Sequence, residues 1–327
     1  MDKNKNLLAE EIKKKILSNF VGYAKLFTPF QSDFLVGLYG RYQCLDNGSL
    51  VLYFAKKTHQ AILRNKEYDL GYDLSFEKFW NNHSNILIPP ATIMNIAKDS
   101  NLPKETTRRK LSELIKHKIF IKKNKHIVWL PGEEYKQNYN KFVAQEIRSV
   151  AKLTKYVTDI MNLNFSVDEI AIEYHKKFSF YWFHFLDLQL KWMKLWKKRF
   201  NDLEIALIFL QLSTLLSSKL TIDKTISHRS LYEEPSIINT PGVQNVSISA
   251  TSVSDITGIP RATCIRKLNL MAKQKIVSQD KNSKRYYIIP EAFNKNLVSK
   301  DLTEEASTIY SEFYYISIKA LSSKNLH

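Results

Sequence analysis

The chain has 327 residues, 44% of them hydrophobic, and eight glycines, a composition that excludes disordered and fibrous classes and allows two or three domains. Lys and Arg outnumber Asp and Glu by 49 to 32, so the formal net charge is +17, which favours an acidic partner such as nucleic acid. A general enrichment in lysine is the alternative explanation of this charge.

Cysteine content and hydropathy indicate in which cellular compartment the protein is expected. The two cysteines, Cys44 and Cys264, are too few for a disulfide framework, and neither has a partner at metal-ligand spacing. The first residues contain no apolar signal segment, and the longest mostly apolar run, Leu203 to Leu216, is too short to cross a bilayer. We therefore expect a cytoplasmic protein with no metal, no cofactor and no membrane association.

The predicted elements begin with a helix from Ala9 to Phe20, because apolar residues recur there on one face. A second helix is expected over Gln31–Gln43, and the turn-forming sequence Asp46-Asn-Gly-Ser49 is expected to end it. The next segment, Lys56–Ser84, is polar and aromatic, and we interpret it as a loop with one short helix.

A helix-turn-helix pattern follows. The sequence Leu102-Pro-Lys-Glu-Thr-Thr-Arg-Arg-Lys-Leu111 predicts a helix that starts at its proline, where a missing N–H costs nothing. A short helix, Ile93–Asp99, precedes it. Two β-rich runs, Ile119–Lys123 and His126–Leu130, come after it and predict a basic hairpin that ends at Pro131.

Most of this pattern returns in the second half of the chain as Ile259-Pro-Arg-Ala-Thr-Cys-Ile-Arg-Lys-Leu268. A short helix, Ala250–Ile256, precedes the second copy, and runs at 276–279 and 285–289 follow it as a second hairpin before Pro290. Each copy carries a charge of about +7 from its second helix through its hairpin. Positive charge is therefore concentrated in the two repeated segments.

The duplication extends beyond these motifs. A gapless alignment places Asp33–Tyr39 on Asp202–Ile208 and, continued in the same register, His59 on His228. Long helices are expected at Tyr139–Met161, at the aromatic-rich Phe178–Phe200 and at Leu302–Leu321. We thus predict a first half at 1–165 and a second half at 166–327, with the repeated segments at about 86–131 and 246–290.

The stretches Leu-Pro-Lys-Glu-Thr-Thr and Ile-Pro-Arg-Ala-Thr resemble the start of the recognition helix in winged-helix bacterial transcription regulators of the MarR and IclR groups. The resemblance covers both repeated segments. It implies a mainly α fold with small β-hairpin wings, in which two winged-helix domains form a duplicated, pseudo-twofold arrangement with long packing helices. The homodimer of the MarR group would here become a pseudo-dimer within one chain, and a true homodimer is the alternative.

The candidate nucleic-acid-binding residues lie on the outer faces of the two predicted recognition helices and on the two hairpins. They are Lys104, Thr106, Arg108, Arg109, Lys110, Lys122, Lys123, Lys125, Arg261, Thr263, Arg266, Lys267, Lys281, Lys284 and Arg285. Within this set we expect base contacts from Arg108, Lys110, Arg261 and Lys267. The remaining helix residues and the hairpins are expected to contact phosphates.

Motifs of enzymes are missing from the sequence, which contains no phosphate-binding loop, nucleophile elbow or metalloprotease motif. We therefore expect a non-enzymatic regulator of transcription that binds double-stranded DNA. A plasmid-type replication initiator with two winged helices, and a winged-helix scaffold for protein interactions, are the alternatives. The operator, the direction of regulation and a small-molecule effector stay open.

Overall fold

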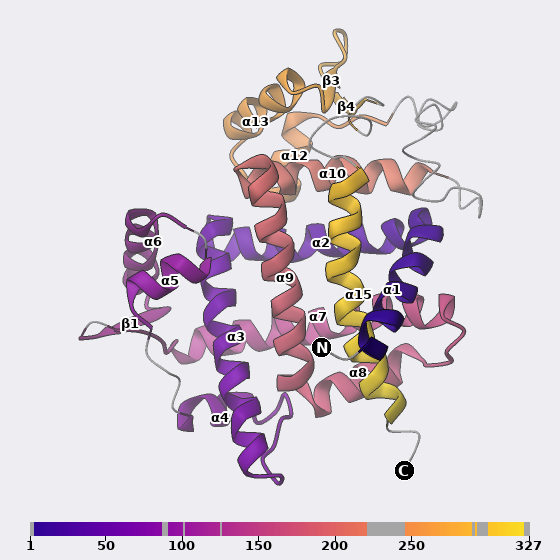
Figure 1. Cartoon of the computed structure of the whole chain (residues 1–327). Coiled ribbons are helices and arrows are strands. Elements are labelled where there is room, and N and C mark those ends of the chain that lie inside the picture. Colours follow the sequence, from indigo (N-terminus) through magenta and orange to yellow (C-terminus); the bar gives the residue numbers. More distant parts are fainter. Residues whose placement is uncertain are drawn as a thin grey trace. The chain divides into compact units, whose positions relative to one another are not determined.

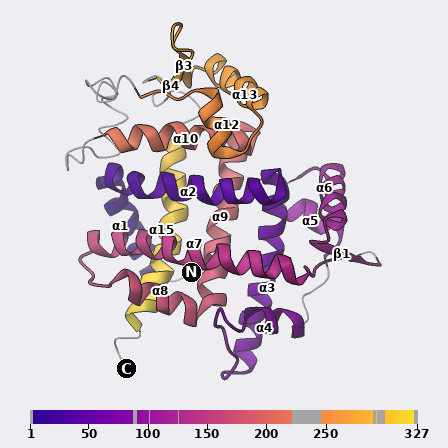
Figure 2. The same ribbon diagram turned by 180° about the vertical axis from the view of Figure 1, so that it is seen from behind.

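The computed structural model describes residues 3–86, 91–100, 102–124, 126–220, 246–289, 292 and 300–323. In this part the chain is mostly helical and contains two small antiparallel hairpins (Figure 1; Figure 2 shows the other side). The coarse prediction of a mainly α fold with small hairpins is therefore confirmed.

Two compact units divide the molecule. Unit 1 comprises Met1–Leu45, Tyr156–Leu163 and Leu195–Tyr315, and unit 2 comprises Asp46–Lys155, Asn164–Lys194 and Ile316–His327. These units do not coincide with the predicted halves, because each unit takes helices from both.

The elements distribute between the units as follows. Unit 1 contains α1 (Lys3–Ser18), α2 (Phe20–Tyr42), α10 (Leu203–Lys219), α12 (Ala250–Thr257), α13 (Arg261–Lys273), β3 (Val277–Gln279) and β4 (Tyr286–Ile288). Unit 2 contains α3 (Leu45–Tyr68, of which only Leu45 belongs to unit 1), α4 (Phe79–Asn85), α5 (Ile93–Ser100), α6 (Lys104–Lys116), β1 (Phe120–Lys123), β2 (His126–Trp129) and α8 (Val167–Lys176). Three further helices contribute residues to both units: α7 (Glu133–Ile160), α9 (Phe178–Phe200) and α15 (Lys300–Ser322).

The core of unit 1 is built on the pairing of α2 with α10. Residues on all sides of α10 are buried, as its apolar sequence predicts, so this helix lies inside the unit. Asp202 caps it by accepting hydrogen bonds from the backbone N–H groups of Glu204 and Ile205. Within the interface, Gln211 Nε2 donates to Ser32 Oγ over 2.7 Å, which satisfies a buried amide.

Aromatic side chains from several elements form the core of unit 2. The Phe79 ring of α4 lies 4.6 Å from the His59 ring of α3 and 5.5 Å from the Phe178 ring of α9, measured between centroids. The Trp129 ring of β2 lies 5.8 Å from the Tyr139 ring of α7. The contact between Trp129 and Tyr139 joins β2 to α7 in the core of unit 2.

The prediction is wrong for residues 46–68, whereas the loop and short helix expected further along the chain are present at 69–78 and in α4. Residues 46–49 lie in the first turns of α3, and that helix continues to Tyr68 through the segment interpreted as a loop. The Asp46 carboxylate suits the positive end of the helix dipole, and Asn47 is buried and donates from Nδ2 to Glu113 Oε2 over 3.2 Å. Tertiary contacts therefore override the turn propensity of this sequence.

The alignment of Asp33–Tyr39 with Asp202–Ile208 is also wrong as a structural register. Asp33 lies inside α2, whereas Asp202 is the N-cap of α10, so the two residues are not equivalent. The match of His59 with His228 cannot be assessed, since residue 228 lies outside the described residues.

Each repeated motif forms what we call a helix–hairpin segment. The first helix–hairpin segment (91–129) runs through α5, α6, β1 and β2, and the second helix–hairpin segment (248–288) runs through α12, α13, β3 and β4. The hairpin registers pair Phe120 with Trp129 and Val277 with Ile288. In each segment a residue ahead of the first helix makes an isolated antiparallel bridge to the last strand, Ala91 to Ile127 and Ile248 to Tyr286.

Gly258 ends α12 in the left-handed conformation, with φ of 71° and its N–H donating to the Ser254 carbonyl over 2.8 Å. We expect Gly258→Ala to destabilise unit 1 by about 1 kcal/mol, because a Cβ is disfavoured at this φ. Gly40→Ala is the matched control: this exposed glycine lies inside α2 with open space around it, and the same change should gain about 0.5–1 kcal/mol. Thermal unfolding of the two variants checks the opposite signs, and equal shifts would contradict this account of the cap.

Among the described residues, no single helix is long and apolar enough to cross a membrane. Helices α9 and α10 meet the length and composition requirement only together, as a pair bent at the break between them.

Candidate nucleic-acid interface

The outer face of α6 carries the predicted contact residues of the first helix–hairpin segment. Lys104, Arg108 and Arg109 are exposed, and Thr106 is half-buried. The Arg108 guanidinium makes an ion pair of 2.8 Å with Glu105 Oε2 one turn earlier, and both side chains are well exposed. The pair holds the guanidinium over the start of the helix.

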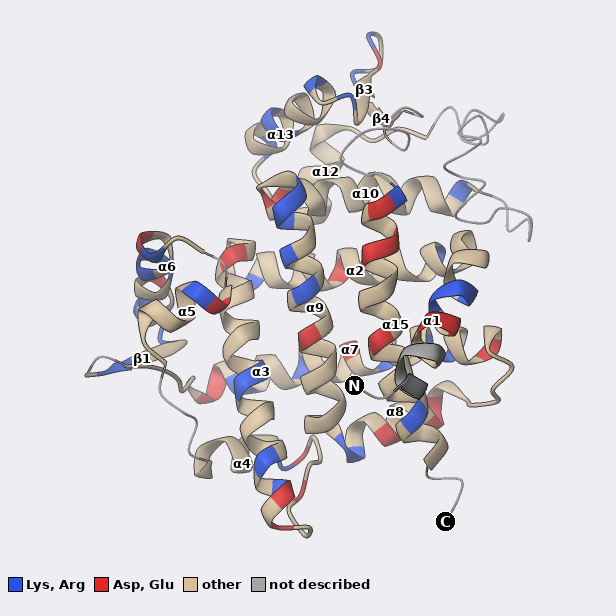
Figure 3. Cartoon of the chain, in the orientation of Figure 1, with Lys and Arg blue, Asp and Glu red and all other residues tan. Residues whose placement is uncertain are grey.

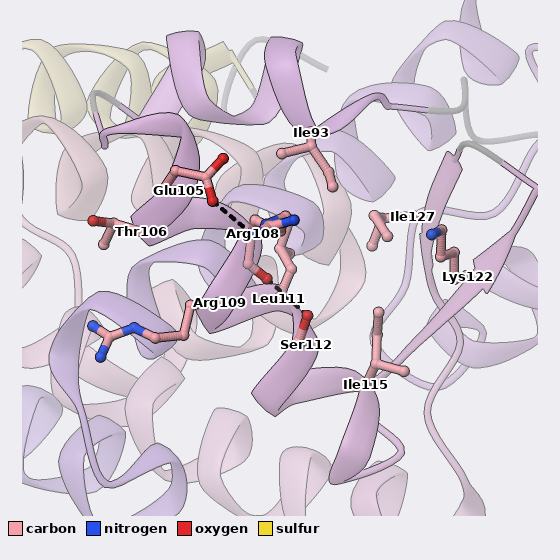
Figure 4. Close-up of a pocket in the computed structure, with 10 residues that line it drawn as sticks. All are labelled: Ile93, Glu105, Thr106, Arg108, Arg109, Leu111, Ser112, Ile115, Lys122 and Ile127. Carbon is pink, nitrogen blue, oxygen red and sulfur yellow. Dashed lines mark hydrogen bonds and ion pairs between the residues drawn. The ribbon is translucent and has the colours of Figure 1, made fainter.

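A groove of about 770 Å³ lies beside this face (Figure 4). Its walls come from most of the length of α6, between Glu105 and Ile115, from Ile93 of α5, and from Lys122 and Ile127 of the hairpin. Arg108 and Arg109 both line it. Cations of the helix and of the hairpin therefore line the same groove in this segment.

Lys110 does not belong to that exposed face. Its side chain is only 7% exposed, and its Nζ lies 3.7 Å from Asp46 Oδ2 in the first turn of α3. The prediction that Lys110 reaches a base edge is wrong, because the ammonium is directed into unit 2 and paired there. Its position next to Leu111 on the inner edge of the helix explains this burial.

The outer face of α13 repeats the arrangement in unit 1. Arg261 and Arg266 are exposed, and Thr263 is half-buried. Arg261 Nε donates to Thr251 Oγ1 over 3.0 Å, so the guanidinium bridges the two helices of the segment. This contact leaves the remaining guanidinium N–H groups available for an acceptor on a ligand.

Lys267 is buried as Lys110 is, with a side chain 7% exposed. Its Nζ donates to Asp202 Oδ2 and lies 3.3 Å from Glu204 Oε2, both at the start of α10. Burial raises the pKa of Glu204, as does the adjacent Asp202 carboxylate. Although burial opposes it, hydrogen bonding from Glu204 and Lys267 holds the pKa of Asp202 below its ordinary value. The prediction that Lys267 contacts bases is therefore wrong.

The first hairpin is basic on its outer side. Lys122 and Lys123 are exposed on β1, next to Asn124, whose positive φ of 56° suits a tight hairpin turn. Lys125 lies outside the described residues. Lys and Arg residues cluster on α6 and on β1 (Figure 3).

The second hairpin has an ordered tip. Asp280 Oδ1 accepts hydrogen bonds from the backbone N–H groups of Asn282 and Ser283, which lowers the pKa of the carboxyl group. Lys281 and Lys284 are exposed. Arg285 is exposed as well, but its guanidinium donates to the Ser247 carbonyl, with Nη2 at 2.7 Å. Some of the guanidinium N–H groups that were predicted to bind phosphate are thus already donated within the chain.

The acidic partners of the buried lysines were not found from the sequence. Asp46 precedes Lys110 by nearly the same distance along the chain as Asp202 precedes Lys267. That nearly equal spacing was a usable signal, since it repeats between the two copies. The two ion pairs are also alike in position. A buried lysine of α6 is paired at the start of α3, and a buried lysine of α13 is paired at the start of α10.

No protein-family model, curated protein or solved structure matches this chain. Within the described ranges, no group of three or more His, Cys, Asp or Glu side chains could hold a metal ion.

Cys264 is fully buried with its Sγ near the Ile259 carbonyl, as expected for a small core residue.

Proposed function

We propose that the chain is a sequence-specific regulator of transcription that binds double-stranded DNA through two winged helices, one in each helix–hairpin segment. The observation that carries the proposal is the repeated geometry: a helix with exposed Arg residues and a half-buried Thr, followed by an antiparallel hairpin with exposed Lys residues. A helix of this kind fits the major groove, and cations on the hairpin suit phosphates.

A second comparison of the two parts of the chain supports duplication outside the helix–hairpin segments. When the sequence is aligned with itself so that Phe20 falls on Phe178, α2 is paired with α9, both 23 residues long, and α3 is paired with α10. Identical residues recur in this register at Phe20/Phe178, Tyr23/Tyr181, Phe27/Phe185, Gln31/Gln189 and Leu45/Leu203. The left-handed residues Gln43 and Asn201, between the paired helices, follow the same register. One chain therefore offers two related DNA-binding segments, as a pseudo-dimer requires.

The proposed contacts differ from the sequence prediction at the buried Lys110 and Lys267, at Arg285, which donates to Ser247, and at Lys125, which lies outside the described residues. Arg108 and Arg261 remain the candidates for base edges, whereas Lys110 and Lys267 hold their helices against α3 and α10. Phosphates would be bound by residues that are exposed or half-buried on the same faces and on the hairpins. These are Lys104, Thr106, Arg109, Lys122, Lys123, Thr263, Arg266, Lys281 and Lys284.

The salt dependence of binding tests the proposal. Replacing Lys122 and Lys123 by Ala should weaken binding to all DNA sequences alike and flatten the plot of log K against log salt by about two, one for each lost phosphate contact. Fluorescence anisotropy with labelled genomic fragments measures this slope.

The matched control is Lys141→Ala with Lys152→Ala, which removes two exposed charges from α7 and should leave the slope almost unchanged. If both double variants gave the same slope of log K against log salt, the first hairpin would not contact phosphates. A wild-type protein with no salt-dependent DNA binding would instead favour a protein-interaction scaffold. Direct-repeat binding sites rather than a palindrome would favour a replication initiator.

A further inference from the structure

The two helix–hairpin segments can be compared position by position. Helices α6 and α13 both contain 13 residues and both start after a proline, with φ of −55° and −53°. With these prolines aligned, the inner faces of the helices bury the same four positions. The pairs are Thr107/Cys264, Lys110/Lys267, Leu111/Leu268 and Leu114/Met271. Equivalent outer positions therefore occupy equivalent places on the two helices.

One part of the outer face is alike in the two helices. Thr106 and Arg109 of α6 correspond to Thr263 and Arg266 of α13. The charge and hydrogen-bonding capacity of these positions are alike. Groups that are alike in both copies suit the phosphate backbone, which is the same at every DNA sequence.

A neighbouring row differs between the helices. In α6 it consists of Glu105, Arg108 and Ser112, and all three line the groove beside the hairpin (Figure 4). In α13 the same positions hold Ala262, Ile265 and Asn269. Since the rows are equivalent in position and different in chemistry, they are the positions at which the two segments can select different bases.

In the first segment the row is a charged pair. The Glu105 carboxylate holds the Arg108 guanidinium at 2.8 Å, which limits the rotamers of a long exposed side chain before DNA arrives. An oriented guanidinium can donate two parallel hydrogen bonds to O6 and N7 of guanine. The Glu105 carboxylate also repels phosphates. DNA binding at this part of the helix is therefore favourable only when Arg108 contacts a base.

In the second segment two of the three positions in the row are apolar. Ala262 is exposed and Ile265 is half-buried, so neither can donate a hydrogen bond to a base from its side chain. Asn269 is engaged by the hairpin, because the Tyr286 hydroxyl of β4 donates to its Oδ1 over 2.9 Å. The methyl group of thymine is the one apolar feature on a base edge in the major groove, and Ala and other apolar side chains pack against it.

We infer that the two segments select different bases: α6 takes guanine through Arg108 held by Glu105, and α13 takes thymine through the contact of its methyl group with Ala262 and Ile265. This inference rests on the proposed function, since it assumes that both helices enter the major groove. The preferred site is then a guanine-containing half next to a thymine-containing half.

Selection from random-sequence duplexes followed by uracil substitution tests the inference. Deoxyuridine differs from thymidine only by the methyl group, so replacing the contacted thymine should weaken wild-type binding about fourfold. Ile265→Ala should bind the thymine and uracil duplexes with nearly equal affinity. Arg108→Ala should lose about 5- to 150-fold of the preference for guanine in the other half-site and keep the preference for thymine over uracil.

Arg266→Ala is the matched control on α13, and it should weaken binding to all duplexes while preserving the ratio of thymine to uracil affinity. An Ile265→Ala variant that still distinguishes thymine from uracil would overturn the assignment of α13. Selection of two identical half-sites would overturn the inference and leave the proposed DNA binding intact. Absence of any selected duplex would instead overturn the proposed function itself.

Discussion

Lys267→Ala is expected to lower the free energy of unfolding of unit 1 by about 3 kcal/mol, since it leaves two partly buried carboxylates without their cation. The ammonium is almost fully enclosed between α13 and the start of α10, and Asp202 there also caps α10. Removing it therefore disturbs both the ion pair and the cap. Urea unfolding followed by circular dichroism measures the loss.

The neighbouring Arg266 provides the matched control. Its side chain is exposed, so Arg266→Ala should change the unfolding free energy by less than about 0.5 kcal/mol. The same variant should lose DNA affinity and about one unit of salt slope. If Lys267→Ala kept full stability and lost base preference, Lys267 would be a DNA contact after all, and the ion pair would carry little energy.

Local sequence was sufficient to predict the two helix–hairpin segments. A proline at each helix start, turn residues ahead of it and alternating apolar residues in the hairpins are all local signals, and the elements lie where these signals put them. The exposure of cations such as Arg109 and Arg266 on the two helices also follows from helical periodicity alone.

Features that depend on distant partners could not be predicted in this way. The sequence predicts Lys110 and Lys267 on the outer faces of their helices with the other cations, and only the carboxylates of Asp46 and Asp202 make their burial favourable. The continuous helix α3 was missed because its first residues have the composition of a turn, while Glu113, the partner of Asn47, is far away in the sequence. Both errors concern the same kind of junction, where a helix of the core meets the proposed recognition helix: α3 with α6, and α10 with α13.

Lowering the pH from 7 to 5 is expected to destabilise unit 2, by about 2 kcal/mol for each of two buried histidines. His59 is fully buried and stacks on Phe79, and among the described residues neither ring nitrogen has a hydrogen-bond partner. Burial lowers the pKa of His59 from 6.5 to about 3. Burial, with a contribution from the Lys136 ammonium, lowers the pKa of His83 to about 4.

The sign follows from proton binding. The unfolded chain takes up protons at these histidines below about pH 6.5, whereas the folded unit does so only near pH 3 to 4. The stabilisation is therefore complete above pH 6.5 and is lost as the pH falls through this range. Tryptophan fluorescence reports mainly on this unit, because four of the five tryptophans, Trp80, Trp129, Trp182 and Trp192, belong to unit 2.

Two variants separate the buried histidines from other groups that titrate in the same range. His59→Phe keeps an aromatic ring against Phe79 and removes one titrating group, so urea unfolding should lose about half as much free energy between pH 7 and pH 5. His117→Gln removes an exposed histidine from the end of α6 and should leave the wild-type pH dependence unchanged. If His59→Phe and wild type lost the same free energy, protonation elsewhere would account for the destabilisation in acid, and the aromatic core of unit 2 would not be its cause.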